Sequence, residues 1–286
     1  MRNILVIGAY GLIGSNICKR LEKDYPNAQI SKIKYDDIPP FEDTYDAVIY
    51  AAGYGQPIKF SKDKLETIGI HSGEPLLAAL RSLKKTGKFL YVSSSEIYSG
   101  GPVPSWEHDI GNTTPQHPRA CYIEGKRCGE AICMAFRELG YDVKIARVAL
   151  AYGPGTKKGD TRVINHFIEQ AITTERILMK DKGEATRTYC YIDDTVSLLL
   201  QILLDGSQPV YNVGGFSEFK IWQIADKIAK LTGAEVVPGA DSLKGAPEEV
   251  KMSMHRTLME FPHEFVNMDE GLQRTINYQK QLYGKA

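Results

Sequence analysis

Apolar residues along the chain gather in short runs that alternate with longer amphipathic stretches. Five runs predict buried strands: residues 3–8, part of 29–35, 46–51, 88–93 and 143–148. Three stretches with helical spacing of apolar residues predict helices: residues 11–23, 74–84 and 122–139. Strands that alternate with helices indicate a parallel sheet, so the pattern predicts a doubly wound α/β fold.

The pattern changes after residue 152. A polar loop follows Tyr152-Gly153-Pro154-Gly155, and shorter elements are predicted beyond it: a helix near 163–173, strands at 177–179 and 187–192, and a helix at 221–232. A helix at 194–204 and a strand at 209–213 look like a return to the first sheet. We therefore expect residues 1–152, joined again by 191–214, to form one domain, and residues 153–190 and 215–286 to form a smaller lobe.

Composition excludes several classes of function. Lys plus Arg equals Asp plus Glu at 35 each, so the chain has no net positive field for nucleic acid or an anionic membrane. No apolar stretch approaches the ~18 residues of a membrane span. The five cysteines and six histidines show no metal-ligand spacing, and we expect packing or surface roles for the histidines. We expect a cytoplasmic protein with reduced thiols, no metal and a small-molecule ligand.

A glycine-rich turn joins the first predicted strand to the first helix. It reads Gly8-Ala9-Tyr10-Gly11-Leu12-Ile13-Gly14, and three glycines so placed permit a tight turn, close approach of a pyrophosphate and close helix packing. The alternative is a tightly packed turn that binds nothing, but the strand and helix flanks favour a dinucleotide. The turn therefore predicts a Rossmann domain that binds a nicotinamide cofactor.

The adenosine ribose of such a cofactor is held by an acidic residue about 20 positions beyond the turn. Asp36 and Asp37 are the candidates, and they could also merely begin a loop. Lys32 and Lys34 precede them and would tolerate a 2'-phosphate. NAD is the expected cofactor and NADP is the alternative. The stretch between the second strand and Asp46 is short, so a helix is expected to be missing there.

Tyr122 and Lys126 lie four residues apart, which places them on one face of a helix. A lysine ammonium and a positive nicotinamide ring both favour phenolate, so this tyrosine could exchange protons with a substrate hydroxyl. A Tyr-x-x-x-Lys pair alone is common on surface helices. Its place after a dinucleotide turn and three further strands favours catalysis.

Polar side chains end the fourth predicted strand at Ser93, Ser94, Ser95 and Glu96. This is the edge of the sheet where an α/β enzyme places its ligand. Hydroxyl groups there can orient a substrate oxygen beside Tyr122, although serines also simply terminate strands. The Glu96 carboxylate can act as an acid or base at a second carbon of a sugar.

Together these residues resemble the extended short-chain dehydrogenase/reductase family, in its nucleotide-sugar epimerase/dehydratase branch. Further segments carry the resemblance: Ala51-Ala52-Gly53, Arg147, Tyr152-Gly153-Pro154, Arg187, Tyr191-Ile192-Asp193-Asp194 and Tyr211-Asn212-Val213-Gly214. The resemblance implies cofactor contacts by the glycine turn, Ala51, Ala52, Gly53, Ser93, Tyr122 and Lys126. It also implies substrate contacts by Ser95 and Arg187, an NAD(P)-binding Rossmann domain with a substrate-binding lobe, and a homodimer through the helices near 74–84 and 122–139.

The implied chemistry is oxidation of a sugar C4 hydroxyl. Tyr122 would take the proton, Ser94 would orient the hydroxyl, Lys126 would hold the cofactor ribose, and Glu96 would assist a second step. The segment 117–127, which reads His-Pro-Arg-Ala-Cys-Tyr-Ile-Glu-Gly-Lys-Arg, is most similar to UDP-glucuronate decarboxylases. Dehydration, epimerisation, simple ketone reduction by free cofactor, and dinucleotide sensing without catalysis are the alternatives.

Two positions depart from the family pattern. Ala149-Leu150-Ala151 stands where an asparagine usually contacts the substrate. Glu249-Val250-Lys251 stands where an arginine usually grips the nucleotide phosphates, and Lys251 and Arg256 are the cations that could replace it. A lysine lacks the planar fork of arginine, so an altered substrate or pose is expected.

Overall fold

A six-stranded parallel sheet forms the centre of the molecule in the computed structural model, which describes residues 1–37, 44–240 and 249–285. Its strand order is β2-β1-β3-β4-β5-β9, and every neighbouring pair is parallel. The strands are β1 (Asn3–Ile7), β2 (Gln29–Ile33), β3 (Tyr45–Tyr50), β4 (Leu83–Ser94), β5 (Asp142–Val148) and β9 (Val210–Val213). The order reverses between β1 and β3, as in a doubly wound sheet, so the predicted fold class is confirmed.

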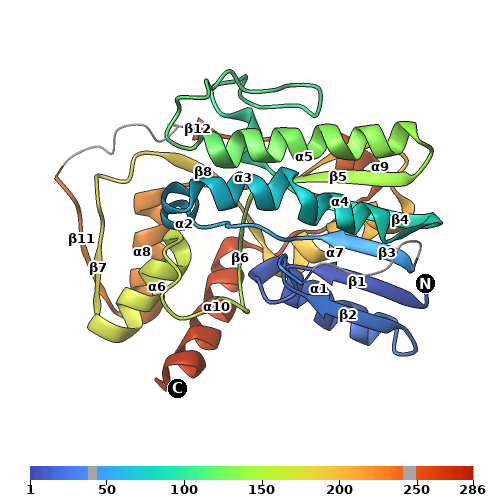
Figure 1. Cartoon of the computed structure of the whole chain (residues 1–286). Helices are drawn as coiled ribbons and strands as arrows, with labels where there is room; N and C mark the ends of the chain where they lie inside the picture. The colour runs from blue at the N-terminus through green and yellow to red at the C-terminus, as the bar shows by residue number, and fades with distance from the viewer. Residues whose placement is uncertain (38–43, 241–248, 286) are drawn as a thin grey trace.

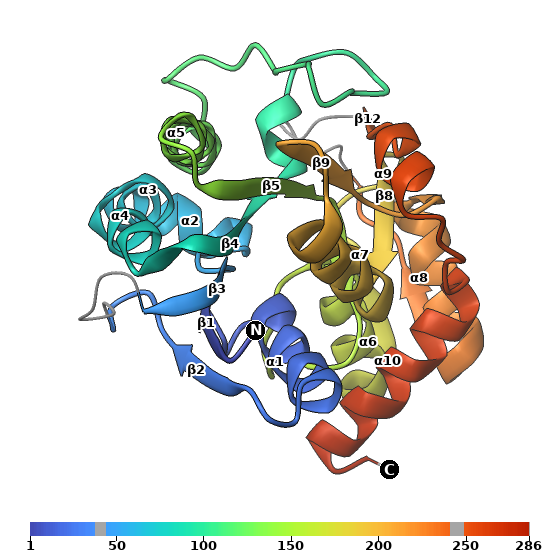
Figure 2. The same cartoon turned by 90° about the vertical axis from the view of Figure 1, so that its right-hand side faces the viewer.

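Helices cover both faces of this sheet (Figure 1, Figure 2). One face carries α1 (Leu12–Asp24) and α7 (Ile192–Asp205), and the other carries α3 (Lys64–Ser72), α4 (Glu74–Arg81) and α5 (Ala120–Glu138). Side chains of β1 alternate between two apolar clusters, because Ile4 and Val6 pack on the first face whereas Leu5 and Ile7 pack on the second. A strand buried on both sides explains the continuous apolar run in the sequence.

Short elements beyond residue 149 form a second layer beside α1 and α7 (Figure 2). Two small sheets contain β6 (Leu150–Tyr152), β7 (Arg176–Leu178), β8 (Thr186–Tyr191), β10 (Ser217–Lys220), β11 (Glu235–Val237) and β12 (Glu249–Val250). The helices are α6 (Val163–Thr174), α8 (Ile221–Thr232), α9 (His255–Glu260) and α10 (Met268–Tyr283). Strand β6 pairs with β8, and β9 then returns to the large sheet. The division of the chain into a cofactor domain and a substrate lobe remains a prediction.

Several elements differ from the sequence prediction. The helix expected to reach residue 84 ends at Arg81, because the Ser82 carbonyl accepts hydrogen bonds from the Thr44 and Tyr45 amides and the chain turns into β4. The helices α2 (Pro57–Lys62) and α3 were not predicted. The expected missing helix before β3 falls mainly on residues 38–43, which lie outside the described residues. Across the described ranges, no helix combines the length and apolarity that a membrane span requires.

Candidate active site

A cavity of about 430 Å³ lies at the carboxyl ends of the large sheet, where it meets the second layer. Its lining includes the segments that follow β3, β4 and β5, together with residues of α5, α6 and β8. Predicted site residues among the lining are Ile13, Ala51, Ala52, Gly53, Ser93, Ser94, Ser95, Glu96, Tyr122, Lys126 and Arg187. Residues far apart in the sequence therefore meet where an α/β enzyme binds its ligand.

The glycine turn between β1 and α1 is closely packed at two of its three glycines. A Cβ on Gly14 would lie 2.2 Å from the Gly8 carbonyl oxygen, and one on Gly8, whose φ is 83°, would lie 2.6 Å from the Ala51 oxygen. At Gly11 the nearest atom would lie 3.4 Å away. Gly8 and Gly14 thus serve the packing, whereas Gly11 keeps the N-terminus of α1 open.

That helix N-terminus fits a pyrophosphate. Gly11 is the N-cap of α1, makes no side-chain cap, and is followed by a first turn without acidic residues. The first amides of a helix lack partners within the helix and carry partial positive charge, so they bind anions. A dinucleotide seated here would reach the cavity past Ile13 and the segment 51–53. The residues present therefore suit the predicted cofactor.

Other members of the predicted cofactor set lie outside the cavity lining. Tyr10 is 52% exposed, and its hydroxyl donates to the Lys32 carbonyl oxygen at 3.3 Å. Asp36 and Asp37 are exposed just beyond β2, whose Ile33 carbonyl accepts hydrogen bonds from the turn. The Lys32 ammonium forms an ion pair with Glu22. This pairing engages one of the two lysines considered for a 2'-phosphate.

The proposed catalytic tyrosine is enclosed by aromatic rings. The Tyr122 ring stacks on Phe60 of α2, with centroids 4.6 Å apart, and meets the edge of His71 of α3 at 5.1 Å. Burial raises the pKa of Tyr122 to about 12, although the hydrogen bond with Ser94 opposes the shift. In the protein alone, burial therefore outweighs the groups that favour phenolate.

Lys126 faces the same cavity from the next turn of α5. Its ammonium donates to the Val92 carbonyl oxygen of β4 at 2.7 Å. Burial lowers the pKa of Lys126 to about 7, against the opposing effect of Glu130. The lysine is thus part neutral near pH 7, which differs from the permanent ammonium assumed from the sequence.

Ser93 is tied to a buried ion pair beneath the cavity. Its hydroxyl donates to Glu130 at 2.5 Å, and Glu130 in turn accepts two-pronged hydrogen bonds from Arg147 of β5. Arg147 also donates to the Tyr98 hydroxyl and the Glu107 carbonyl. Arg147 therefore supports the ends of β4 and β5 from below and does not line the cavity.

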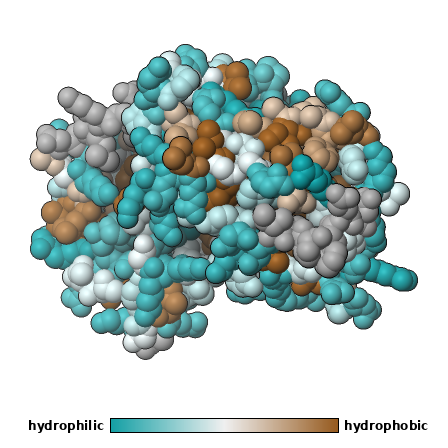
Figure 3. All heavy atoms as spheres, in the orientation of Figure 1, coloured by the Kyte–Doolittle hydropathy of each residue, from teal (hydrophilic) through white to brown (hydrophobic). Residues whose placement is uncertain are grey.

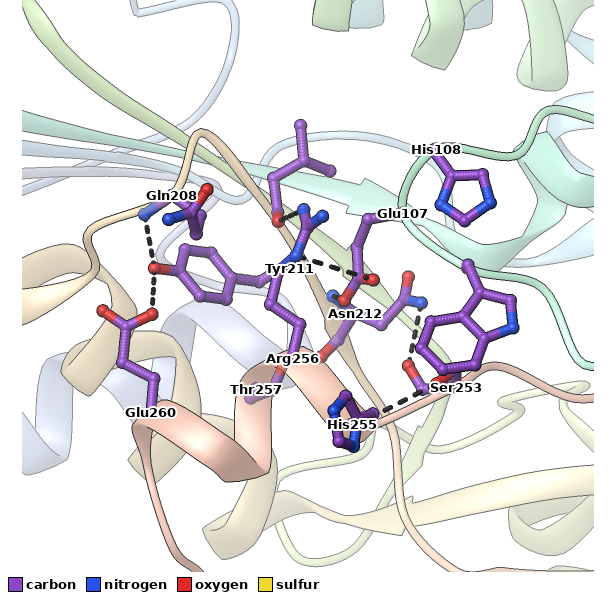
Figure 4. A network of polar contacts seen from close by, with 12 residues as sticks. Glu107, His108, Gln208, Tyr211, Asn212, Ser253, His255, Arg256, Thr257 and Glu260 are labelled. Atoms are coloured by element: carbon purple, nitrogen blue, oxygen red, sulfur yellow. Dashed lines mark hydrogen bonds and ion pairs between the residues drawn. The ribbon is translucent and has the colours of Figure 1, made fainter.

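This polar network continues to the surface (Figure 4). The Glu107 carboxylate accepts a hydrogen bond from the backbone N–H of Asn212 at 3.1 Å, and its second oxygen lies 3.8 Å from Nε of Arg256. Arg256 also donates to the Val210 carbonyl. The network holds the loop after β4 against β9 and α9. Arg256 is consequently engaged away from the cavity, and Lys251 pairs with Glu218 at 2.8 Å. Neither residue lines the cavity, and their replacement of a phosphate-binding arginine stays a prediction.

Glu96 forms an ion pair that the sequence did not reveal. The Arg119 guanidinium donates a hydrogen bond to Oε1 of Glu96 at 2.6 Å, and the guanidinium carbon Cζ of Arg119 lies 5.6 Å from the Phe60 ring centroid. The second oxygen, Oε2, is buried and has no hydrogen-bond partner among the residues that the structure describes. One carboxylate oxygen is therefore held by Arg119, while the other is buried and unpaired in the wall of the cavity.

Arg187 of β8 enters the cavity from the second layer. Its Nη1 donates to the Thr186 carbonyl at 2.7 Å, and burial lowers its pKa from the ordinary value. Arg162 also lines the cavity and pairs with Asp160 at 2.5 Å, whereas Lys157 and Lys158 do not line it. Cations thus gather opposite the dinucleotide turn.

The cavity residues that sequence reasoning missed include Phe60, His71 and Arg119. The ordinary surface or packing role expected for His71 stays a prediction, and the residue is 1% exposed, packs against the Tyr122 ring and lines the cavity. The segment that carries Phe60 and His71 has no period that marks a site. For Arg119 a signal existed, since it lies within the Tyr122 segment that supports the family resemblance.

Known proteins resemble the chain over most of its length. It is 27% identical to UDP-glucuronic acid decarboxylase 1 of Xenopus tropicalis, over 100% of this chain and 74% of that protein. It is 29% identical to UDP-glucuronic acid decarboxylase 6 of Arabidopsis thaliana, over 82% of this chain and 75% of that protein. The crystal structure of Thermotoga maritima UDP-glucose 4-epimerase with UDP-glucose has a TM-score of 0.85 at 21% identity, and the match covers 98% of this chain and 99% of that one. At that identity the structural match shows a shared fold.

A family profile also matches the chain. Residues 4–214, which include the glycine turn, the Tyr122 segment and the return strand β9, match the NAD dependent epimerase/dehydratase family. This match confirms the predicted family and the prediction of NAD as the cofactor. The chain is an enzyme that belongs to the NAD dependent epimerase/dehydratase family.

Proposed function

We propose that the enzyme acts on a nucleotide sugar, oxidises its C4 hydroxyl, and then removes carbon dioxide from C5 before the C4 ketone is reduced again. The similarity to UDP-glucuronic acid decarboxylases points to UDP-glucuronate as the first substrate to test. The observation that carries the proposal is the meeting of Tyr122, Ser94, Lys126 and Glu96 on one cavity.

In the first step, Tyr122 takes the proton of the C4 hydroxyl while Ser94 holds that hydroxyl in place. When bound, NAD supplies the hydride acceptor and donor, and its positive charge favours the phenolate of Tyr122. Lys126 leaves the Val92 carbonyl to hold the ribose. A protonated Lys126 on the ribose would favour the phenolate of Tyr122 by its positive charge.

In the second step, the C4 ketone weakens the bond between C5 and its carboxylate. The free oxygen of Glu96 is suited to hold or transfer a proton at this position, since Arg119 fixes the other oxygen. Arg119 and Arg187 provide positive charge for an anionic sugar and its diphosphate.

Mass spectrometry of the purified protein with UDP-, GDP-, dTDP- and CDP-sugars, without added cofactor, tests the proposal. Loss of carbon dioxide from UDP-glucuronate is the expected result. Loss of water or a change of stereochemistry in another sugar would assign Glu96 to a dehydratase or epimerase instead. Steady consumption of added NADPH would identify a ketoreductase, and binding without any turnover would identify a sensing protein.

Tyr122→Phe is the decisive variant. General acid–base catalysis contributes about 10²- to 10⁴-fold, so turnover should fall by that factor while the Kd for NAD stays within about twofold. The phenylalanine keeps the stack on Phe60, which makes misfolding an improbable cause of the loss. Unchanged turnover would remove Tyr122 from the chemistry.

We also propose a cytoplasmic homodimer formed through α4 and α5. Apolar side chains gather over α5 on the face shown in Figure 3. Exposed residues of α5 include the small Cys128, Ala131 and Ala135, which permit close approach of a second helix. All five cysteines are free, in keeping with a reducing compartment. Light scattering of wild type and Ala131→Arg should give a dimer and a monomer respectively.

A further inference from the structure

His71 is a buried polar group with unmet hydrogen-bonding capacity. Its side chain is 1% exposed, and neither Nδ1 nor Nε2 has a partner among residues 1–37, 44–240 and 249–285. Leaving a buried donor or acceptor unpaired costs about 1–3 kcal/mol per group. A histidine used only for packing would be replaced at this position by an apolar residue of similar volume without that cost.

Two glycines of α5 bring His71 to this position. A Cβ on Gly125 would lie 3.2 Å from the Cβ of His71, and one on Gly129 would lie 2.4 Å from the His71 carbonyl oxygen. That carbonyl accepts a hydrogen bond from the Tyr91 hydroxyl at 2.9 Å. The close contact of α3 with α5 therefore fixes the backbone of His71 directly beside Lys126 and Tyr122.

The imidazole packs against the segment that follows β3, at the dinucleotide end of the cavity. A Cβ on Gly53 would lie 1.9 Å from its Cε1, so the ring lies directly under the segment that follows β3. The same segment contacts the glycine turn through Ala51. Glu96, in the turn after β4, and Arg187 of β8 also line the cavity.

The charge state of the ring restricts what it can bind. Burial, and then the positive charge of Lys126, hold the pKa of His71 well below its ordinary value, so the imidazole is neutral at neutral pH. A neutral imidazole offers one donor and one acceptor. A hydroxyl group has the same two capacities, and each ribose of a dinucleotide carries such groups.

We propose that His71 is a cofactor-binding residue of this enzyme, whose imidazole forms a hydrogen bond with a ribose hydroxyl of NAD between Gly53 and Lys126. The inference rests on the proposed function, because it places NAD in the cavity beside Tyr122. It adds a residue to the cofactor site that the glycine turn and the Tyr122-Lys126 pair do not include.

His71→Leu and His71→Asn test the proposal through two measurements, the affinity for NAD and the unfolding temperature without NAD. The proposal predicts that His71→Leu lowers the affinity but does not lower the unfolding temperature. His71→Leu should weaken NAD binding by about three- to tenfold, since one neutral hydrogen bond is lost. The unfolding temperature of this variant without NAD should stay equal or rise, because the unpaired nitrogens are gone. His71→Asn keeps one donor and one acceptor and should restore binding to within about threefold of wild type. A lower unfolding temperature with unchanged NAD affinity would instead assign a packing role.

Imidazole NMR of the ¹⁵N-histidine-labelled chain identifies the ligand. The ring signals of His71 are assigned as those that disappear from the spectrum of His71→Asn. Addition of NAD should shift these signals, while the signals of the exposed His108 should stay in place. Movement with UDP-glucuronate but not with NAD would place His71 in the substrate site and overturn the proposal. Bound NAD with an unmoved His71 signal would also overturn it. If wild type fails to bind NAD at all, the proposed function itself fails, so the two failures are distinguishable.

Discussion

The two ends of the cavity are built from different parts of the chain. At the dinucleotide end, formed by Ile13 and residues 51–53 beside the glycine turn, the shape depends on backbone atoms and on glycines that allow two segments to touch. At the charged end, formed by Glu96, Arg119 and Arg187, it depends on long side chains from three separate elements. One end tolerates few substitutions for steric reasons, whereas the other can exchange side chains without disturbing the fold.

This contrast separates what the two ends determine. A pyrophosphate at these backbone amides would be bound in the same way whatever sugar is processed, so we expect the dinucleotide end to serve any reaction that uses the cofactor. In the proposed mechanism, the reaction after C4 oxidation depends on which charges face the sugar. The charged end should therefore decide substrate and product, and substitutions at the two ends should affect different quantities.

The largest effect is expected at Gly14. A methyl group there would lie 2.2 Å from a backbone oxygen, which cannot move without distorting the turn. Gly14→Ala should lower the free energy of unfolding by about 3 kcal/mol, measured by denaturant titration. Gly11→Ala is the matched control, because its methyl group meets only an ordinary contact at 3.4 Å, and it should unfold like wild type within about 0.5 kcal/mol. Equal losses in both variants would contradict the distinction between the packing glycines and Gly11.

Arg187 should give the next largest effect, in substrate affinity alone. A hydrogen bond between a guanidinium and a phosphate or carboxylate contributes about 1.5–3 kcal/mol, so Arg187→Met should raise the Kd of the nucleotide sugar by roughly ten- to a hundredfold. The Kd for NAD should stay within about twofold, because the dinucleotide end is unchanged. Calorimetric titration with each ligand separates the two. Equal weakening of both would show that Arg187 shapes the whole cavity.

The glycine turn lies where the sequence predicted it, between β1 and α1, and this has a physical reason. Glycines at fixed spacing between a strand and a helix are a local requirement, and Gly8, Gly11 and Gly14 lie within seven residues. Buried strands such as β1 are also visible locally, because both of their faces are apolar. These features depend little on residues elsewhere in the chain.

The charged end and His71 depend on contacts across the fold. Arg119 reaches Glu96 over 23 positions, and His71 reaches the cavity only because Gly125 and Gly129 let α3 approach α5. A pattern within one segment does not encode such pairings. The exchange of the family asparagine for Ala149-Leu150-Ala151 was visible in the sequence, but its neighbours in space were not.

Arg119 offers a sharper test of the charged end. Arg119→Gln should leave the rate of oxidation at C4 intact. It should slow the second chemical step, and with it the formation of product, about tenfold, because Glu96 loses the hydrogen bond that fixes its orientation. Reduced nicotinamide, followed by its absorbance in a single turnover, should then accumulate. Arg119→Lys keeps the charge and should restore part of the rate. An equal fall in the rate of nicotinamide reduction would instead implicate Arg119 in the first step.

The smallest effect concerns the pH dependence of stability, and it tests whether Lys126 is as buried as the cavity geometry indicates. Its pKa of about 7 in the folded protein lies below the ordinary value of 10.5, so the unfolded chain binds the extra proton between these values. Stability therefore rises with pH across this window, and the contribution is lost as pH falls through 7.

Between about pH 6 and about pH 8 the wild type should gain about 1 kcal/mol in free energy of unfolding relative to Lys126→Met, which has no proton to lose. Urea unfolding of both proteins without NAD measures this difference. Parallel pH curves would mean that Lys126 keeps its charge in the folded enzyme and is more hydrated than its hydrogen bond to Val92 suggests.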